Sequence, residues 1–191
     1  MPRPDTSPRT LLYDRTVRSR VEYLDPTRCR TTATLVDESV TEHLRPTIVH
    51  DMSLLGDFDP RSMELLWIDA RMDTRPHGSC TLAVAPVQQL VGLTLGRGFS
   101  TAAAARTGGA QGCSHMRTLV DAMVTASVLS HGARVALELD SHEIGDQQAF
   151  LRRILDTYPA IVDSCQGWRA DGPVVRGLQS GDDASSSGDS G

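Results

Sequence analysis

The sequence predicts an α+β protein, in which an antiparallel sheet of three or more strands is followed by helices packed on one face. Two observations lead to this prediction. Over residues 9–24 and 28–40, polar and apolar side chains alternate with a period of two, as they do in half-buried strands. After Pro76 the pattern changes, and over residues 114–129 apolar residues recur every three or four positions, as they do on a helix that covers a sheet.

The strands are expected at residues 9–24, 28–40, 47–56 and 63–73. The first two alternate charged or hydroxyl side chains with apolar ones. The residues from Asp57 to Pro60 favour a turn, so the last two strands are expected to form a hairpin. The first half of the chain should therefore be an antiparallel meander.

Helices are expected at residues 80–91, 100–106, 114–129 and 145–157. Ser79 and Ser100 are suitable N-caps for the first two, and His131 with Gly132 should close the third. The third helix has the clearest pattern, because its apolar residues form one buried stripe: Met116, Leu119, Val120, Met123, Val124 and Val128.

The 191 residues are enough for one domain with a hydrophobic core. We expect a flexible, proline-rich arm over residues 1–8, a single α+β domain over 9–177 and a disordered polar tail over 178–191. The tail is rich in Ser, Gly and Asp, and it cannot bury enough apolar surface to offset its ordering entropy.

Composition excludes several classes of function. The formal net charge of −5 argues against nucleic acid as a partner. No apolar run is long enough for a membrane helix and none opens the chain as a secretory signal, so no membrane partner and a cytoplasmic location are expected. The four cysteines should then be thiols or metal ligands. A homodimer is left open.

Arginines cluster near the start of the chain, at positions 15, 18, 20, 28 and 30. Such a strip can hold the carboxylate or phosphate of an anionic small-molecule substrate. A solvated strand face gives the same pattern and is the commoner explanation.

The segment Gly112-Cys113-Ser114-His115 is the strongest candidate for a functional site. Free N–H groups at a helix N-terminus stabilise a thiolate, which suits Cys113 to be a nucleophile or a metal ligand. Residues two apart on a helix differ by about 200° around its axis, so Cys113 and His115 can converge only if Cys113 precedes the helix. The alternative is a buried cysteine beside a capping histidine.

Other candidate ligands also lie at the expected boundaries of elements: His50, Asp51 and Cys80. Together with Cys113 and His115 they form a mixed set that suits a Zn or Fe ion. The spacing matches no zinc finger, so the ligands would come from scattered loops, as they do in catalytic sites. On a strand, only one of His50 and Asp51 would face the site.

Three functions follow from this set. The first is a metal-dependent enzyme that acts on a small carbonyl-containing molecule by hydrolysis, hydration, lyase or cyclisation chemistry, with His50 or Asp51 as the general acid or base. The second is a non-enzymatic metal or iron–sulfur carrier. The third is a metal-free enzyme with Cys113 as its nucleophile.

Several motifs together resemble a bacterial domain family of unknown function. Members of that family typically contain His-Asp-Met, then Pro and Cys, then Leu-x-Gly, and then Gly-Cys-Thr-His-Leu. Here the corresponding residues are His50-Asp51-Met52, Pro76 with Cys80, Leu90-Val91-Gly92 and Gly112-Cys113-Ser114-His115-Met116. The similarity covers most of residues 15–176 and implies no particular activity.

A more distant resemblance is to the iron–sulfur scaffold proteins of the IscU and NifU N-terminal type. That resemblance implies a NifU/IscU-like sheet followed by helices, with Asp51, Cys80 and Cys113 at the positions of scaffold ligands. The first scaffold cysteine is missing here, and the scaffold order His-Cys is replaced by Cys113-Ser114-His115. These differences weaken the case for cluster assembly and leave metal binding in place.

Overall fold

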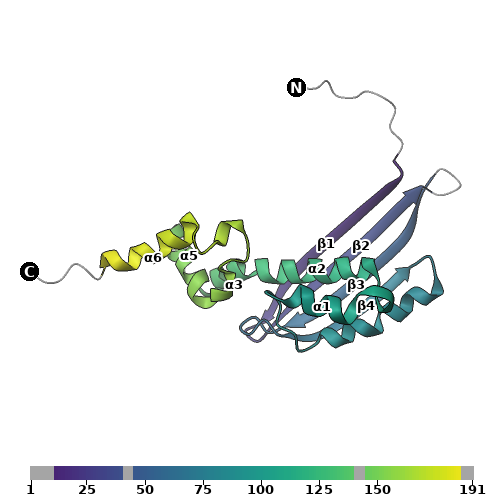
Figure 1. The fold of residues 1–191 in the computed structure, drawn as a ribbon, viewed down its shortest axis with the longest axis horizontal. Coiled ribbons are helices and arrows are strands. Elements are labelled where there is room, and N and C mark those ends of the chain that lie inside the picture. The colour runs from purple at the N-terminus through teal and green to yellow at the C-terminus, as the bar shows by residue number, and fades with distance from the viewer. Residues whose placement is uncertain (1–10, 41–44, 140–144, 186–191) are drawn as a thin grey trace, which may run out of the picture.

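The computed structural model describes residues 11–40, 45–139 and 145–185. Over these residues the chain has the predicted α+β fold, in which a four-stranded antiparallel sheet precedes the helices (Figure 1). The arm predicted for residues 1–8 lies outside the described residues.

The sheet is the predicted meander. Its strands are β1 (Tyr13–Asp25), β2 (Arg28–Val40), β3 (Pro46–Phe58) and β4 (Leu65–Thr74). Each strand pairs antiparallel with the next, in the spatial order β1-β2-β3-β4. At the β1–β2 turn, Asp25 Oδ1 accepts hydrogen bonds from the backbone and the hydroxyl of Thr27, which fixes the turn that the Asp-Pro-Thr sequence favours.

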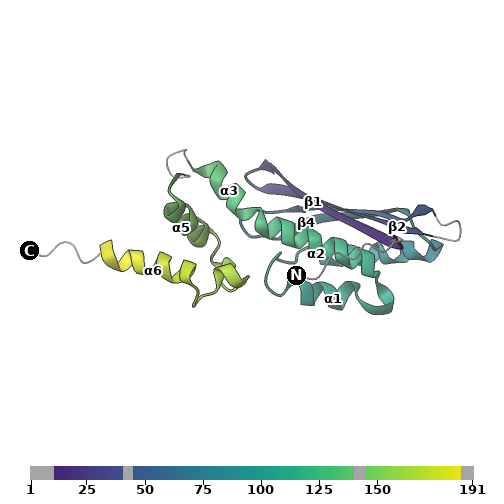
Figure 2. The same ribbon diagram turned by 90° about the horizontal axis from the view of Figure 1, so that it is seen from above.

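Alternation along β2 and β3 decides which side chains face the helices. On β2 the odd-numbered residues are buried: Cys29, Thr31, Ala33, Leu35 and Asp37. On β3 the even-numbered residues Met52, Leu54 and Phe58 are buried. Helices α1 (Phe99–Thr107) and α2 (Ser114–Leu129) lie on this side of the sheet (Figure 2). A charged residue at an odd position of β2 is therefore carried into the interior.

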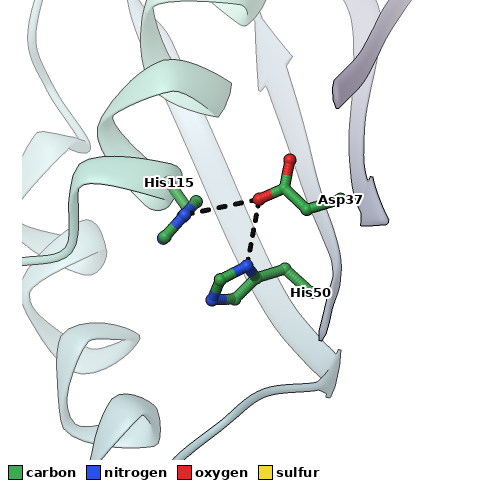
Figure 3. A group of neighbouring side chains, drawn as sticks. All are labelled: Asp37, His50 and His115. Carbon is green, nitrogen blue, oxygen red and sulfur yellow. Dashed lines mark ion pairs between the residues drawn. The ribbon is translucent and has the colours of Figure 1, made fainter. Parts of the chain in front are cut away.

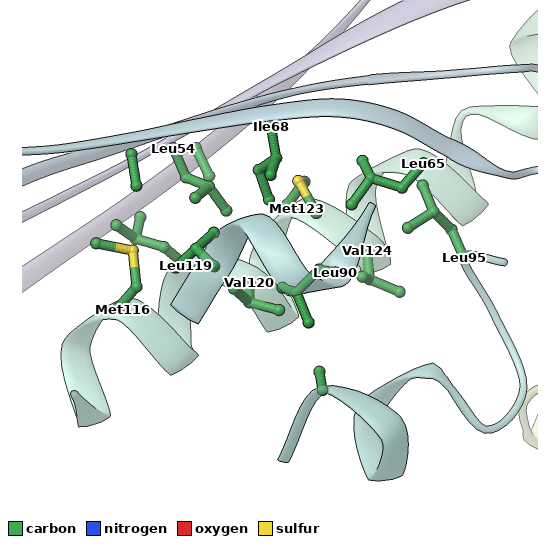
Figure 4. Close-up of a cluster of buried hydrophobic side chains, with 14 of the residues drawn as sticks. Leu54, Leu65, Ile68, Leu90, Leu95, Met116, Leu119, Val120, Met123 and Val124 are labelled. Atoms are coloured by element: carbon green, nitrogen blue, oxygen red, sulfur yellow. The ribbon is translucent and has the colours of Figure 1, made fainter. Parts of the chain in front are cut away.

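Helix α2 (Ser114–Leu129) covers the face, and its predicted apolar stripe is confirmed. Met116, Leu119, Val120 and Met123 are buried against residues of the sheet such as Leu54 and Ile68 (Figure 4). A Cβ atom on Gly56 of β3 would lie 2.7 Å from Met123 Sδ, so glycine is what permits this close approach of helix and strand.

The helix predicted over residues 80–91 is wrong. The chain instead forms two 3-10 helices, η1 (Gly78–Ala83) and η2 (Ala85–Leu90), and Ser79 does not cap them. Their bonds span three residues, as in Val84 N–H to Thr81 O at 3.1 Å. The physical reason is Pro86, which has no N–H to donate and whose ring blocks the α-helical ladder.

Helix α1 (Phe99–Thr107) lies where a helix was predicted, but its N-cap is Gly98 rather than Ser100. Gly98 has a φ of 83°, a left-handed conformation that favours glycine. The short η3 (Gly109–Gln111) then leads into α2.

The junction after α2 corrects another expectation. His131 does not close α2 but begins α3 (His131–Glu138). Ser130 between the two helices keeps a right-handed helical conformation, with φ −67° and ψ −11°. The chain therefore turns into a new helix without leaving helical geometry, and Gly132 is accommodated inside it.

The remaining helices are α5 (Gln147–Thr157), η4 (Pro159–Ile161), η5 (Gln166–Trp168) and α6 (Pro173–Ser185). With α3, the helices α5 and α6 lie beyond one end of the sheet in both views (Figures 1 and 2). Helix α6 extends past residue 177, where the folded part was expected to end. Among the described residues, no helix combines the length and the apolar character needed to cross a membrane.

Candidate metal centre

Asp37, His50 and His115 meet at one end of the covered face and are called the Asp/His/His site here (Figure 3). Strand pairing brings the first two together, since Asp37 of β2 lies directly opposite His50 of β3. His115 comes from the first turn of α2, which begins above this end of the sheet. Three separate elements therefore each supply one side chain.

The three side chains are close and shielded from water. Asp37 Oδ2 lies 3.0 Å from His50 Nδ1 and 3.3 Å from His115 Nε2. The carboxylate of Asp37 is fully buried, while the side chains of His50 and His115 keep 14% and 21% of their surface exposed. The two imidazole rings lie against each other, with centroids 3.8 Å apart. The site therefore has a buried anionic side and a side that solutes can reach.

One atom of the site is left unsatisfied. His50 Nδ1 is near Asp37 Oδ2, yet the direction between them does not suit a hydrogen bond, and the buried nitrogen has no hydrogen-bond partner among the described residues. A buried polar nitrogen without a partner is costly and needs an explanation. A cation between nitrogen and oxygen would satisfy the lone pairs of both.

Arg15 of β1 holds the carboxylate from its other side. Its Nε and Nη2 donate to Asp37 Oδ1 and Oδ2 at 2.7 and 2.9 Å, and Nη2 also donates to the Tyr13 hydroxyl at 2.8 Å. Burial by itself raises the pKa of Asp37, but the hydrogen bonds from Arg15 and Tyr13 and the nearby positive charge lower this pKa to about 2. Asp37 is therefore an anion at neutral pH.

His115 is held in the neutral form. Burial lowers the pKa of His115, and the neighbouring His50 and Arg15 lower it further. Its Nδ1 lies 3.5 Å from the sulfur of Cys113, while its Nε2 faces Asp37. A contact on one ring nitrogen that leaves the other facing the site is the usual arrangement of a metal-binding histidine.

The spacing of the ligand atoms fits a small divalent cation. One ligand atom from each residue lies within 4.8 Å of the other two. An ion about 2.0 to 2.1 Å from its ligands in tetrahedral geometry requires ligand atoms about 3.3 Å apart. Two nitrogens and one carboxylate oxygen suit Zn²⁺ or Fe²⁺ and leave coordination positions open, as catalytic sites do.

The structure brings together some of the residues selected from the sequence. His50 and His115 are both in the site, and Cys113 lies beside it as the N-cap residue of α2. Cys113 has an extended backbone, with φ −137° and ψ 131°, so it precedes the helix as its contact with His115 requires.

Two further residues from the sequence analysis are not part of the converging group. Asp51 follows His50 on β3 and therefore lies on the opposite side of the sheet, where it pairs with Val36 and Thr74. Cys80 lies in η1 and packs against the hydrophobic core. All four cysteines are free thiols.

Asp37 was missed by the sequence analysis, although a signal was present. In the segment from Thr31 to Asp37, the residues two apart are Thr, Ala, Leu and Asp. The alternation that buries Ala33 and Leu35 also buries Asp37, and a carboxylate on a buried face needs a charged or metal partner. The arginine strip likewise contributes one member, Arg15, through its contact with this carboxylate.

The comparisons with known proteins give one match. The family model described as a protein of unknown function (DUF2889) matches residues 13–129, which include the whole sheet and α2. No curated protein and no solved structure matches the chain, so nothing found there supports the resemblance to iron–sulfur scaffolds. The chain belongs to the DUF2889 family of proteins of unknown function.

Proposed function

We propose that the Asp/His/His site binds one Zn²⁺ or Fe²⁺ ion and that the protein is a metal-dependent enzyme acting on a small carbonyl-containing molecule. The observation that supports metal binding best is the buried, unpartnered Nδ1 of His50, 3.0 Å from the carboxylate of Asp37. His115 Nε2 adds a third ligand atom, 3.3 Å from the same carboxylate oxygen.

Such an ion supplies Lewis acidity: it polarises a carbonyl oxygen, or lowers the pKa of a bound water to about 7. These properties serve hydrolysis, hydration, lyase and cyclisation reactions alike. With three protein ligands, positions remain open for a substrate oxygen.

The other residues of the site prepare its ligands. Arg15 donates to both oxygens of Asp37, and together with Tyr13 it lowers the pKa of this carboxyl and keeps it ionised. Cys113 contacts His115 on the nitrogen that faces away from Asp37, and so orients the ring. Arg15 still exposes a third of its side chain, which supports a substrate that carries a carboxylate or phosphate.

The test is elemental analysis of protein purified without a histidine tag. About one equivalent of Zn or Fe per chain is expected for the wild type and for H77A, which removes a histidine that is exposed and outside the site. H50A should contain less than about a tenth of an equivalent, because it removes one of only three ligands. Folded wild-type protein without metal, or an H50A variant with full metal content, would contradict the proposal.

One contact favours a second function. Cys113 Sγ lies 3.5 Å from His115 Nδ1, the pairing that activates a cysteine nucleophile. If Cys113 attacks substrate in a metal-free enzyme, iodoacetamide should alkylate it rapidly, and H115A should slow that alkylation. If His115 binds metal instead, adding a chelator should change the rate of alkylation.

A further inference from the structure

The two edges of the sheet differ in how they are protected. The outer edge of β4 is covered by η2 and the segment that follows it: Leu65 N–H donates to Leu93 O at 2.9 Å, and Gln88 Nε2 of η2 donates to Ile68 O at 2.7 Å. Within the described part of the chain, no segment pairs with the outer edge of β1. An open edge of this length presents a row of unpaired backbone groups.

The register of β1 shows which of its backbone groups are available. Val40 N–H donates to Leu12 O at 3.0 Å, so the even-numbered positions of this strand bond to β2. Pairing between β1 and β2 continues without a bulge from Tyr13 to Tyr23. Because backbone groups in an antiparallel strand alternate in direction, the odd-numbered residues direct their N–H and C=O groups to the open edge.

Side chains next to this edge are also incompletely covered. Tyr13, Val17 and Tyr23 lie on the helix-covered side of the sheet, but they remain 46%, 38% and 47% exposed. On the other side of the same strand, the charged residues are Asp14, Arg18, Arg20 and Glu22, so two arginines lie between two acidic residues. The edge thus combines free backbone groups, apolar side chains and a distinctive charge pattern.

We propose that β1 pairs antiparallel with β1 of a second copy of this chain, which joins two sheets into one continuous sheet. The register sets Val17 opposite the partner's Val17. Asp14 then lies opposite the partner's Arg20, and by symmetry this ion pair forms twice. Tyr13 lies opposite the partner's Val21, also twice. Opposite charges and aromatic–aliphatic pairs across strands both stabilise a sheet.

The charges disfavour the registers whose centre moves from Val17 toward the C-terminal end of β1, whereas a centre at Thr16 would set Asp14 opposite the partner's Arg18. Moving the centre from Val17 to Arg18 sets Arg18 against itself and Asp14 against Glu22. A register centred on Ser19 sets Arg18 opposite the partner's Arg20. A register centred on Arg20 sets Arg20 opposite the partner's Arg20. A shift by one more residue sets Val17 against Asp25 and crosses the bulge between Tyr23 and Asp25. Like charges directly opposite each other are destabilising.

The pairing goes beyond the proposed metal chemistry and does not depend on it. It does bring the two copies close to the metal site, since Arg15 would lie opposite the partner's Ser19. The pairing is tested by the oligomeric state alone, so a protein that dimerises but contains no metal would support this proposal and contradict only the proposed metal site.

The test is a charge exchange followed by sedimentation velocity on the full chain. The wild type should be a dimer at micromolar concentration. D14R and R20D should each raise the dissociation constant of the dimer at least about tenfold, because each replaces two ion pairs with two like-charge contacts. The double variant D14R/R20D should recover the wild-type constant. A monomeric wild type, or a double variant no tighter than D14R, would overturn the proposal.

Proline variants test the backbone part of the proposal independently. Val17 N–H faces the open edge, so V17P should abolish the dimer while the monomer keeps its circular dichroism spectrum and most of its thermal stability. Thr16 N–H faces β2, so T16P should lower the melting temperature instead. A V17P variant that remains fully dimeric would rule out this edge as the interface.

Discussion

Helix α2 has a buried or half-buried histidine at each end, and the two have opposite surroundings. His115 in its first turn faces the carboxylate of Asp37 and the ring of His50. His131, just beyond its last turn, accepts a hydrogen bond on Nδ1 from Arg134 at 2.7 Å and lies against the ring of Tyr158.

The comparison shows that burial of a histidine does not by itself indicate a site. Burial lowers the pKa of both residues, so both are neutral imidazoles. At His131 the guanidinium of Arg134 occupies the Nδ1 lone pair, and the buried Nε2 has no hydrogen-bond partner in the described part of the chain. No acidic side chain among the described residues forms an ion pair with this ring, so the anion that a metal site needs is missing. At His115 an anion and a second imidazole converge, which is what a metal requires.

The largest effect should come from removing the anion. D37A should weaken the binding of Zn²⁺ by more than about 100-fold, beyond the 10- to 100-fold typical of an outer-shell residue. Competition with a chromophoric chelator measures this affinity. H131Q should leave it unchanged, and equal losses in the two variants would remove the distinction between the two ends of α2.

The next effect concerns the C-terminal end of α2 and the pH dependence of stability. Burial, together with the charge of Arg134, lowers the pKa of His131 from an ordinary value of 6.5 to about 4. The unfolded chain therefore takes up this proton first as the pH falls. Neutral, buried His131 therefore contributes fully to the free energy of unfolding above pH 6.5. This contribution is lost progressively as the pH falls to 4, by about 3 kcal/mol in total.

Urea denaturation at a series of pH values measures this loss. In H131Q the decline in unfolding free energy between pH 6.5 and pH 4 should be smaller by about 3 kcal/mol, since the titrating group is gone. H77A, which removes an exposed histidine, should retain the wild-type slope. A wild-type slope in H131Q would show that another group is responsible.

A smaller effect on Zn²⁺ affinity is expected from Arg15, which donates hydrogen bonds to the carboxylate of Asp37. R15K keeps the positive charge beside Asp37 but cannot donate two parallel hydrogen bonds to its oxygens. Zn²⁺ affinity should fall about tenfold. The matched control is R30K, because Arg30 holds Asp57 in the same two-bond manner on the same sheet and lies away from the site. Unchanged affinity in R15K would mean that Asp37 needs no such support.

The smallest effect is expected from Cys113. Cys113 packs against the hydrophobic core, and its sulfur contacts the nitrogen of His115 that faces away from Asp37, so C113A should weaken metal binding by about tenfold or less. A loss as large as that of D37A would make Cys113 a direct ligand.

Much of the fold follows from local patterns. Alternation predicts the strands, and the three-to-four spacing predicts α2 over its full length. The prediction fails at residues 80–91, where Ser79 is a suitable N-cap but Pro86 removes a backbone donor. It fails again at His131, because a glycine after a helix is also compatible with a bend that stays helical.

The site could be predicted only in part, since its geometry depends on strand register. His50 and His115 stand out by residue type, whereas Asp37 lies in a strand that contains a second acidic residue, Glu38. What selects Asp37 is its position opposite His50, and a bulge between Asp37 and Glu38 shifts the register there. No local pattern in the sequence predicts that bulge.

X-ray absorption at the zinc K-edge of the Zn²⁺-loaded protein tests the central claim most directly, because it identifies the atoms bound to the metal. Binding by Asp37, His50 and His115 predicts a first shell of nitrogen and oxygen at about 2.0 to 2.1 Å, with the outer-shell scattering of two imidazoles. A sulfur atom at about 2.3 Å would contradict this assignment and place a cysteine in the ligand set.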